Sequence, residues 1–279
     1  MNVLELSLLI WVGSIAAGLL GALTGLGGAI VIIPLLTLVC GVEIHYAAGA
    51  ALVAVVATAS GAALAYVRDG YSNLHVGMFL EMATSAGAVA GASVAARVPG
   101  PIVGLIFGIV LLTSAALSLQ RGLDAPPDDP PDRLATWLNM DSTYPTPEGR
   151  QGYHVRRVPL AFALMLIAGT LSGLLGIGSG ALKVLALDRA MHLPFKVSTT
   201  TSNFMIGVTA AASAGVYLNR GYIDPGLAMP VMLGVLIGSL AGARLLPRMH
   251  GRTLRRLFAA SMIALGLEMI RSSLTGGLV

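Results

Sequence analysis

Apolar residues run in long, almost continuous stretches from one end of the chain to the other. Because the stretches do not alternate with polar residues, they are typical of membrane-spanning helices and not of the strands of a membrane β-barrel. One long polar stretch, residues 121–157, is rich in proline and acidic side chains, which predicts an irregular, solvated connector with a short surface helix over 134–138. The ten apolar segments that we predict cover residues 3–23, 28–41, 46–67, 74–96, 101–120, 158–175, 178–191, 197–218, 225–246 and 254–272.

The two halves of the chain match each other at a fixed offset of 151 residues. Gly18 aligns with Gly169 and Tyr66 aligns with Tyr217, and further matches lie in turns as well as within the apolar segments. Shared apolar composition does not explain matches at turns, so we expect an internal duplication of five segments each. The predicted domains are a first transmembrane repeat over 1–120, the connector over 121–157 and a second transmembrane repeat over 158–279.

The composition agrees with a membrane protein. Hydrophobic residues make up 56% of the 279 residues and charged residues only 11%, whereas soluble domains carry about 25% charged residues. The sequence therefore predicts an all-α polytopic membrane protein. The single cysteine excludes an internal disulfide and a thiolate metal cluster, and no cofactor motif is present, so neither a metal nor a cofactor is expected.

The basic residues predict how the chain crosses the membrane. If all ten segments cross, thirteen Lys and Arg residues lie on the side of the connector and three lie on the other side. This bias favours a cytoplasmic connector, both termini outside and, with five crossings in each half, inverted repeats in the cell inner membrane. Segments 28–41 and 178–191 are only about 14 residues long and could be tilted half-helices, so whether they cross fully stays open.

Two glycine clusters precede these two short segments at matching places. Clustered glycine disfavours a helix and accepts backbone angles that other residues avoid, so each cluster is expected to break a helix and expose backbone N–H groups to a small anion. The alternative is close helix packing through small residues, a spacing that Gly169 and Gly173 also fit. The candidate substrate-binding residues here are Gly25, Gly27, Gly28, Gly176, Gly178 and Ser179.

Two charged residues fall within predicted spans. Lys183 lies about five residues into segment 178–191, and an intramembrane lysine is by default a candidate for substrate binding or coupling. Its alternatives are snorkelling to the interface and neutralisation by a structural partner. Glu81 is the deepest carboxylate of the first half, and it either carries a coupled proton or pairs with a basic side chain.

Segment 197–218 begins with an unusually dense run of hydroxyl and amide side chains. These groups can hydrogen-bond an oxyanion without adding charge, although each of them can also join neighbouring helices. The matching stretch of the first half, residues 47–52, is apolar, so the two halves would contribute unequally. We include Thr199, Thr201, Ser202 and Asn203 among the candidate substrate-binding residues.

The run from Gly18 to Pro34, its duplicate, and the run from His192 to Gly207 followed by Gly221-Tyr-Ile-Asp-Pro225 resemble the TauE/SafE sulfite exporter family. The resemblance implies an inner-membrane secondary transporter for sulfite and organosulfur anions, driven by protons. Two features depart from the family pattern: Ala50-Ala51-Leu52 replaces a Thr-Ser-Leu run, and Lys183 is less usual. The positions that fall on family motifs are Gly25, Gly27, Gly28, Gly176, Gly178, Thr201, Ser202 and Asn203.

We therefore expect a secondary transporter that moves a small anion by alternating access of two inverted halves. Its expected partners are the anion, protons and the lipid bilayer, with no nucleic acid, and a homo-oligomer is left open. One alternative is a passive anion channel. Another is an intramembrane enzyme, which the sequence disfavours because the five histidines form no cluster and no nucleophile lies beside a base at depth.

Overall fold

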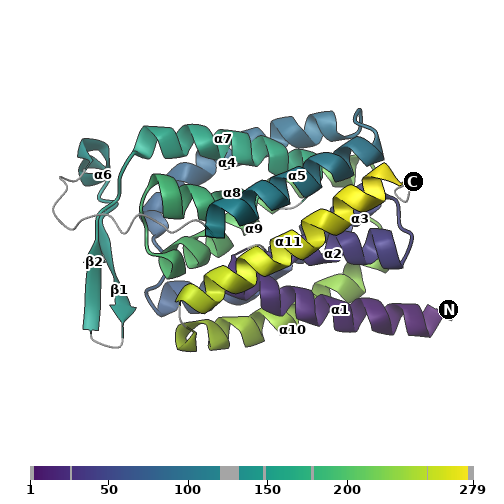
Figure 1. Cartoon of the computed structure of the whole chain (residues 1–279), viewed down its shortest axis with the longest axis horizontal. Helices are drawn as coiled ribbons and strands as arrows, with labels where there is room; N and C mark the ends of the chain where they lie inside the picture. Colours follow the sequence, from purple (N-terminus) through teal and green to yellow (C-terminus); the bar gives the residue numbers. More distant parts are fainter. Residues whose placement is uncertain are drawn as a thin grey trace.

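Each of the ten predicted apolar segments is helical in the computed structural model, which describes residues 3–25, 27–119, 132–146, 149–176, 179–249 and 251–275 (Figure 1). The two short segments each combine an α-helical turn with a π-helical one. The elements are α1 Val3–Thr24, α2 Ala29–Pro34, η1 Leu35–Val39, α3 Ile44–Arg68, α4 Leu74–Ala95, α5 Gly100–Leu119, α6 Arg133–Trp137, β1 Ser142–Thr146, β2 Gly149–Tyr153, α7 Val158–Leu175, α8 Gly180–Leu185, η2 Ala186–Ala190, α9 Phe195–Asn219, α10 Pro225–Leu245, η3 Leu246–Arg248 and α11 Gly251–Leu274.

Four of the described helices, α3, α4, α7 and α10, are long and apolar enough to cross a membrane. Shorter apolar stretches occupy Leu8–Thr24, Ala29–Val39 and Gly100–Ala116. With a rise of about 1.5 Å per residue, the stretch Ala29–Val39 is about 16 Å long, roughly half the thickness of a hydrocarbon core. The prediction of a polytopic helical membrane protein is therefore confirmed, and a count of ten crossings stays a prediction.

The elements of the second half recur at the offset found in the sequence. The bounds of α2, η1 and α3 return 151 residues later as those of α8, η2 and α9. The packing follows the same relation. Helix α1 packs on α10, and their counterparts α7 and α4 pack on each other. Helix α3 packs on its own counterpart α9, and α5 packs on its own counterpart α11. The N-terminal end of α1 and the C-terminal end of α11 lie at the same end of the bundle, opposite α6 and the β-hairpin (Figure 1).

Glycines bring α4 and α7 into backbone contact. A Cβ added at Gly169 would lie 2.1 Å from the Thr84 carbonyl oxygen, and one at Gly173 would lie 1.9 Å from that of Ala88. At the α1–α10 contact, a Cβ at Gly18 would lie 2.2 Å from the Val235 carbonyl oxygen. The alternative interpretation of Gly169 and Gly173 as close-packing residues is therefore confirmed.

The connector is more ordered than the sequence indicated. The short helix was predicted correctly, as α6, but the irregular structure expected elsewhere is wrong for the residues that form the antiparallel β1–β2 hairpin, with Ser142 opposite Tyr153. The strands are held by the Tyr144–Tyr153 ring contact and by a 3.1 Å hydrogen bond from Arg150 Nε to Thr143 Oγ1. Proline-rich composition concealed the hairpin because Pro145 needs no partner for its nitrogen in a two-stranded sheet.

Asn73 ties this connector to the helix bundle. Its Oδ1 accepts a hydrogen bond from Val76 N at the start of α4, and its Nδ2 donates to Met140 O at 2.7 Å and to Tyr153 Oη at 3.0 Å. Burial raises the pKa of the Tyr153 phenol, which keeps it neutral at this junction. One side chain thus sets both the start of α4 and the position of the hairpin.

Replacing Asn73 with alanine is expected to lower the free energy of unfolding by about 1–2 kcal/mol, because α4 loses its cap and the connector loses its anchor. Asn73→Asp keeps the cap acceptor and removes the two donors, so it isolates the contribution of the connector. Asp224, which caps α10 at the matching position, supplies the control variant Asp224→Ala, which removes a cap alone. Equal losses in thermal unfolding for Asn73→Ala and Asp224→Ala would contradict the anchoring role.

Candidate functional site

The first helix break joins α1 to α2. Gly27 and Gly28 both have a φ of 76°, and Gly25 has a φ of 77°, which is the left-handed region that glycine enters without strain. A Cβ at Gly25 would also lie 2.9 Å from the Thr199 carbonyl oxygen in the backbone of α9. The break therefore requires glycine both for its backbone angles and for the closeness of α9.

The second break, between α7 and α8, follows the same pattern with one substitution. Gly176 has a φ of 71°, and a Cβ there would lie 2.4 Å from the Ala48 Cβ of α3. Ser179, which matches Gly28, has a φ of 56° although it carries a side chain, a conformation that costs about 1–3 kcal/mol. The predicted residue Gly178 lies outside the described residues. Both expected helix breaks are thus present.

The polar start of α9 contacts both breaks. Ser202 Oγ lies 3.0 Å from the Gly25 carbonyl oxygen at the end of α1 and 3.4 Å from that of Gly180 at the start of α8. Asn203 Nδ2 donates to the Ala22 carbonyl oxygen at 2.8 Å. The carbonyl groups of Ala22 and Gly25 lie at the C-terminal end of α1, where carbonyls have no partner within the helix, and these side chains supply donors to them. Asn203 Oδ1 is buried and has no hydrogen-bond partner among the described residues.

Two other predicted residues of α9 are used differently. Thr201 Oγ1 accepts a hydrogen bond of 3.0 Å from Asn73 N, which places it at the start of α4. Thr199 Oγ1 donates to the Lys196 carbonyl oxygen of its own helix at 2.9 Å. For Thr199 and Thr201 the geometry favours the alternative role of joining or capping helices over contact with a substrate.

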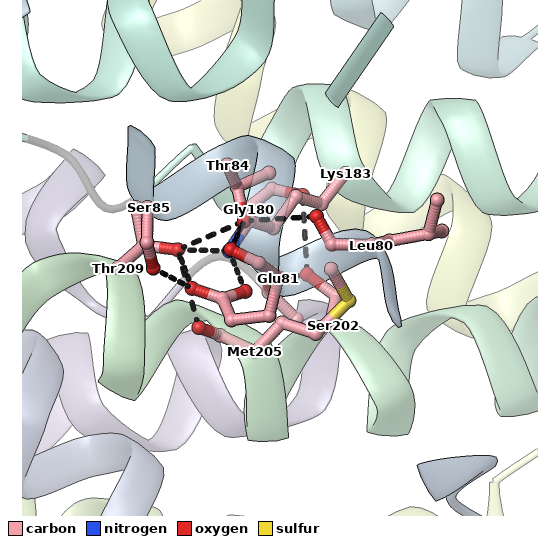
Figure 2. Close-up of polar contacts among 10 residues, drawn as sticks. Leu80, Glu81, Thr84, Ser85, Gly180, Lys183, Ser202, Met205 and Thr209 are labelled. Atoms are coloured by element: carbon pink, nitrogen blue, oxygen red, sulfur yellow. Dashed lines mark hydrogen bonds and ion pairs between the residues drawn. The ribbon is translucent and has the colours of Figure 1, made fainter. Parts of the chain in front are cut away.

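Lys183 and Glu81 form a buried ion pair (Figure 2). The structure thus shows the alternative stated for each residue, a structural partner that neutralises Lys183 and a basic side chain that pairs with Glu81, while substrate binding by Lys183 and proton transfer by Glu81 stay predictions. Lys183 Nζ donates to Glu81 Oε2 at 3.0 Å. Thr209 Oγ1 accepts from Lys183 Nζ and donates to Glu81 Oε1, so it bridges the two charges. Ser85 Oγ donates to Glu81 Oε1 at 2.9 Å. The Lys183 side chain is 0% exposed and that of Glu81 is 8% exposed.

Thr209 and Ser85 were not among the predicted residues. Ser85 follows Glu81 by four positions, which places both on one face of α4. Thr209 follows Ser202 by seven positions, about two helical turns, so it extends the same face of α9 toward Lys183. These spacings are the signals in the sequence that could have identified both hydroxyls.

The charged residues of this network have no charged counterparts at the matching positions of the other half. The residues that match Lys183 and Glu81 at the offset of 151 are Ile32 and Met232, and Ile32 is fully buried. Thr58, which matches Thr209, instead donates to Ala54 O of its own helix at 2.8 Å. Of these two sets of matching positions, only the one that contains Glu81 and Lys183 is charged. Among the described residues, no group of three or more His, Cys, Asp or Glu side chains gathers to hold a metal ion.

Two curated proteins are similar to this chain over most of its length. YunE of Bacillus subtilis (strain 168), described as a probable membrane transporter protein, is 26% identical over 261 residues, which cover 91% of this chain and 93% of YunE. YdhB of the same organism, described in the same words, is 27% identical over 228 residues, 81% of this chain and 85% of YdhB. No solved structure gives a significant match.

A family model described as Sulfite exporter TauE/SafE matches residues 10–269, which include both breaks, Glu81 and Lys183. This match confirms the predicted family, and the names of the relatives agree with a membrane transporter rather than an enzyme. The chain is thus a multi-pass membrane protein and belongs to the TauE/SafE sulfite exporter family of membrane transporters.

Proposed function

We propose that this chain is a secondary transporter of a small oxyanion of the sulfite or organosulfur class. The observation that carries the proposal is a fully buried lysine, Lys183, that lies beside a helix break, pairs with Glu81 and donates a hydrogen bond to the Thr209 hydroxyl. An intramembrane charge of this kind is costly and marks a substrate or ion pathway. The name of the family, which refers to sulfite export, supports the substrate class.

The proposed frame consists of two inverted repeats, 1–120 and 158–279, with ten segments that enter the membrane. In this proposed frame the two breaks, beside the short α2–η1 and α8–η2 pairs, lie at depth in the membrane, as the breaks of discontinuous helices do in other transporter folds. The opposite positions of the termini and the connector in Figure 1 support an odd number of segments in each half. The bias of basic residues further supports a cytoplasmic connector in the inner membrane, with both termini outside.

Alternating access would follow from rocking of the two halves about the site, because Glu81 comes from one half and Lys183 from the other. Ser202 contacts both breaks and would hold them next to each other in the conformation that the structure shows. In this proposal Lys183 binds the anion and Glu81 carries the coupled proton. The glycines and Ser179 allow the backbone of the breaks to move.

The test is flux of radiolabelled sulfite into proteoliposomes that contain the purified protein. A transporter gives saturable uptake, counterflow from preloaded vesicles and a response to an imposed pH gradient. A flux that rises linearly with sulfite concentration and ignores the pH gradient would instead establish the passive anion channel. Thermal unfolding in the presence of sulfite, thiosulfate, sulfoacetate, taurine or phosphate would then rank the substrates, because a ligand stabilises the state that it binds.

A further inference from the structure

The Glu81 carboxylate is held as an oxyanion ligand would be held. Its two oxygens accept hydrogen bonds from three donors on three elements: Lys183 Nζ of α8, Thr209 Oγ1 of α9 and Ser85 Oγ of α4 itself. One ammonium and two hydroxyls are also a suitable donor set for the unprotonated oxygens of a hydrogen sulfite or sulfonate monoanion, which accept hydrogen bonds. The carboxylate thus occupies the place that a substrate oxyanion would need.

We propose that Glu81 is a tethered surrogate for the substrate, and that the anion takes its place at Lys183 as Glu81 takes up one proton. This inference rests on the proposed function and adds a coupling rule, namely that one proton is taken up for each monoanion bound. The bond that forms is the O–H of the protonated Glu81 carboxyl, and the bond that breaks is an O–H of a hydronium ion of the solvent, which becomes water. The ionic hydrogen bond between Lys183 and Glu81 is exchanged for one between Lys183 and the anion.

Charge balance in a buried site makes the two events inseparable. In the structure, the charges of Lys183 and Glu81 cancel at a side-chain exposure of 0% and 8%. A monoanion that entered without a proton would leave one uncompensated negative charge away from water, which is strongly unfavourable. Protonation of Glu81 restores neutrality and also releases the three donors. The loaded site then holds Lys183, one anion and a neutral carboxyl.

The surroundings of Glu81 leave few other groups for the proton. The sequence of α7, which packs on α4, contains no titratable side chain, and neither does that of α5, which packs on α8. The segment η2 beyond α8 carries Asp188 and Arg189, whose side chains lie 3.9 Å apart with opposite charges. The remaining titratable groups on the helices that contact Glu81 lie toward helix ends, namely His75 of α4 and Lys196 and Tyr217 of α9.

One proton per monoanion has a direct electrical consequence. The empty site and the loaded site carry the same net charge, so each transport step of the protein moves no net charge across the membrane. A membrane potential set with potassium and valinomycin is therefore expected to leave sulfite flux unchanged, whereas a pH gradient drives it. The measurement is made where sulfite is the monoanion hydrogen sulfite, so that the anion carries the single negative charge that the charge balance assumes.

The decisive experiment counts protons at binding. Isothermal titration of the wild-type protein with hydrogen sulfite, repeated in two buffers of different ionisation enthalpy, is expected to show uptake of about one proton per bound anion. Glu81→Gln is expected to bind without proton uptake and about tenfold more tightly, because the competing carboxylate is gone. The wild-type proton count needs no variant, so it decides the proposal even if Glu81→Gln does not fold.

The outcomes separate the two proposals. Sulfite binding and flux without proton uptake, or flux that follows the membrane potential, would overturn the surrogate role and leave the transporter function standing. Proton uptake that persists in Glu81→Gln would also overturn it. If the wild-type protein neither binds nor moves sulfite, the proposed function fails for this substrate and the coupling rule fails with it.

Discussion

Replacing Lys183 with methionine is expected to lower sulfite flux by about 100-fold or more. Methionine fills a similar apolar volume, but it removes the charge that binds the anion and leaves the Glu81 carboxylate buried without its cation. Loss of one partner of a buried ion pair costs about 3–5 kcal/mol, and a loss of that size in anion binding corresponds to a factor of about 100 to 4,000. Initial uptake rates in proteoliposomes measure the effect.

The double variant Lys183→Met/Glu81→Gln separates binding from folding. Removing both charges is expected to restore much of the thermal stability lost in Lys183→Met, because no unpaired charge remains, while flux stays absent. Arg97→Met, at an exposed position, is the matched control and is expected to transport normally. Flux near that of the wild type in Lys183→Met would refute the assignment of Lys183 to the anion site.

Gly173→Ala is expected to lower the free energy of unfolding by about 1–3 kcal/mol or more, the usual cost of overpacking. The added Cβ would lie 1.9 Å from the Ala88 carbonyl oxygen and 2.6 Å from Ala92 N. Both contacts are with backbone atoms, so α4 and α7 must separate. Because α4 carries Glu81, the separation is also expected to disturb the ion pair with Lys183 and reduce flux.

Gly215→Ala in α9 is the matched control for this prediction. Nothing lies within 4 Å of a Cβ added at Gly215, and alanine is better than glycine inside a helix by about 1 kcal/mol. The two variants are thus expected to shift the thermal unfolding temperature in opposite directions. A Gly173→Ala protein as stable as the wild type would show that the α4–α7 contact is looser than the structure has it.

The helical frame could be predicted from the sequence because the bilayer makes hydropathy a strong signal. The segment predicted as 178–191, for example, became α8 and η2, Gly180–Ala190. Glycine clusters and the fixed offset also located both breaks, since few residues other than glycine accept their backbone angles. The β1–β2 hairpin was missed because a proline-rich stretch is typical of a disordered linker. Proline is also tolerated in an edge strand, so the composition alone does not distinguish the two.

The site could be predicted only in parts. Lys183 and Glu81 were both identified because an intramembrane charge is exceptional, but they lie 102 residues apart, and no local rule pairs them. Their contact depends on how α4 meets α8 and α9, which is a property of packing. Thr201 was assigned to the substrate by its side-chain chemistry, whereas the hydroxyl accepts from Asn73 N at the start of another helix.

The division of the ion pair between the halves has a consequence for how the chain could have been assembled. Glu81 has Met232 as its counterpart, and Lys183 has Ile32. At these positions, a homodimer of the first half alone would therefore hold two carboxylates and no lysine, and a homodimer of the second half would hold two lysines and no carboxylate. Only a pairing of unlike halves gives a neutral centre, and a single polypeptide that contains both halves guarantees that pairing.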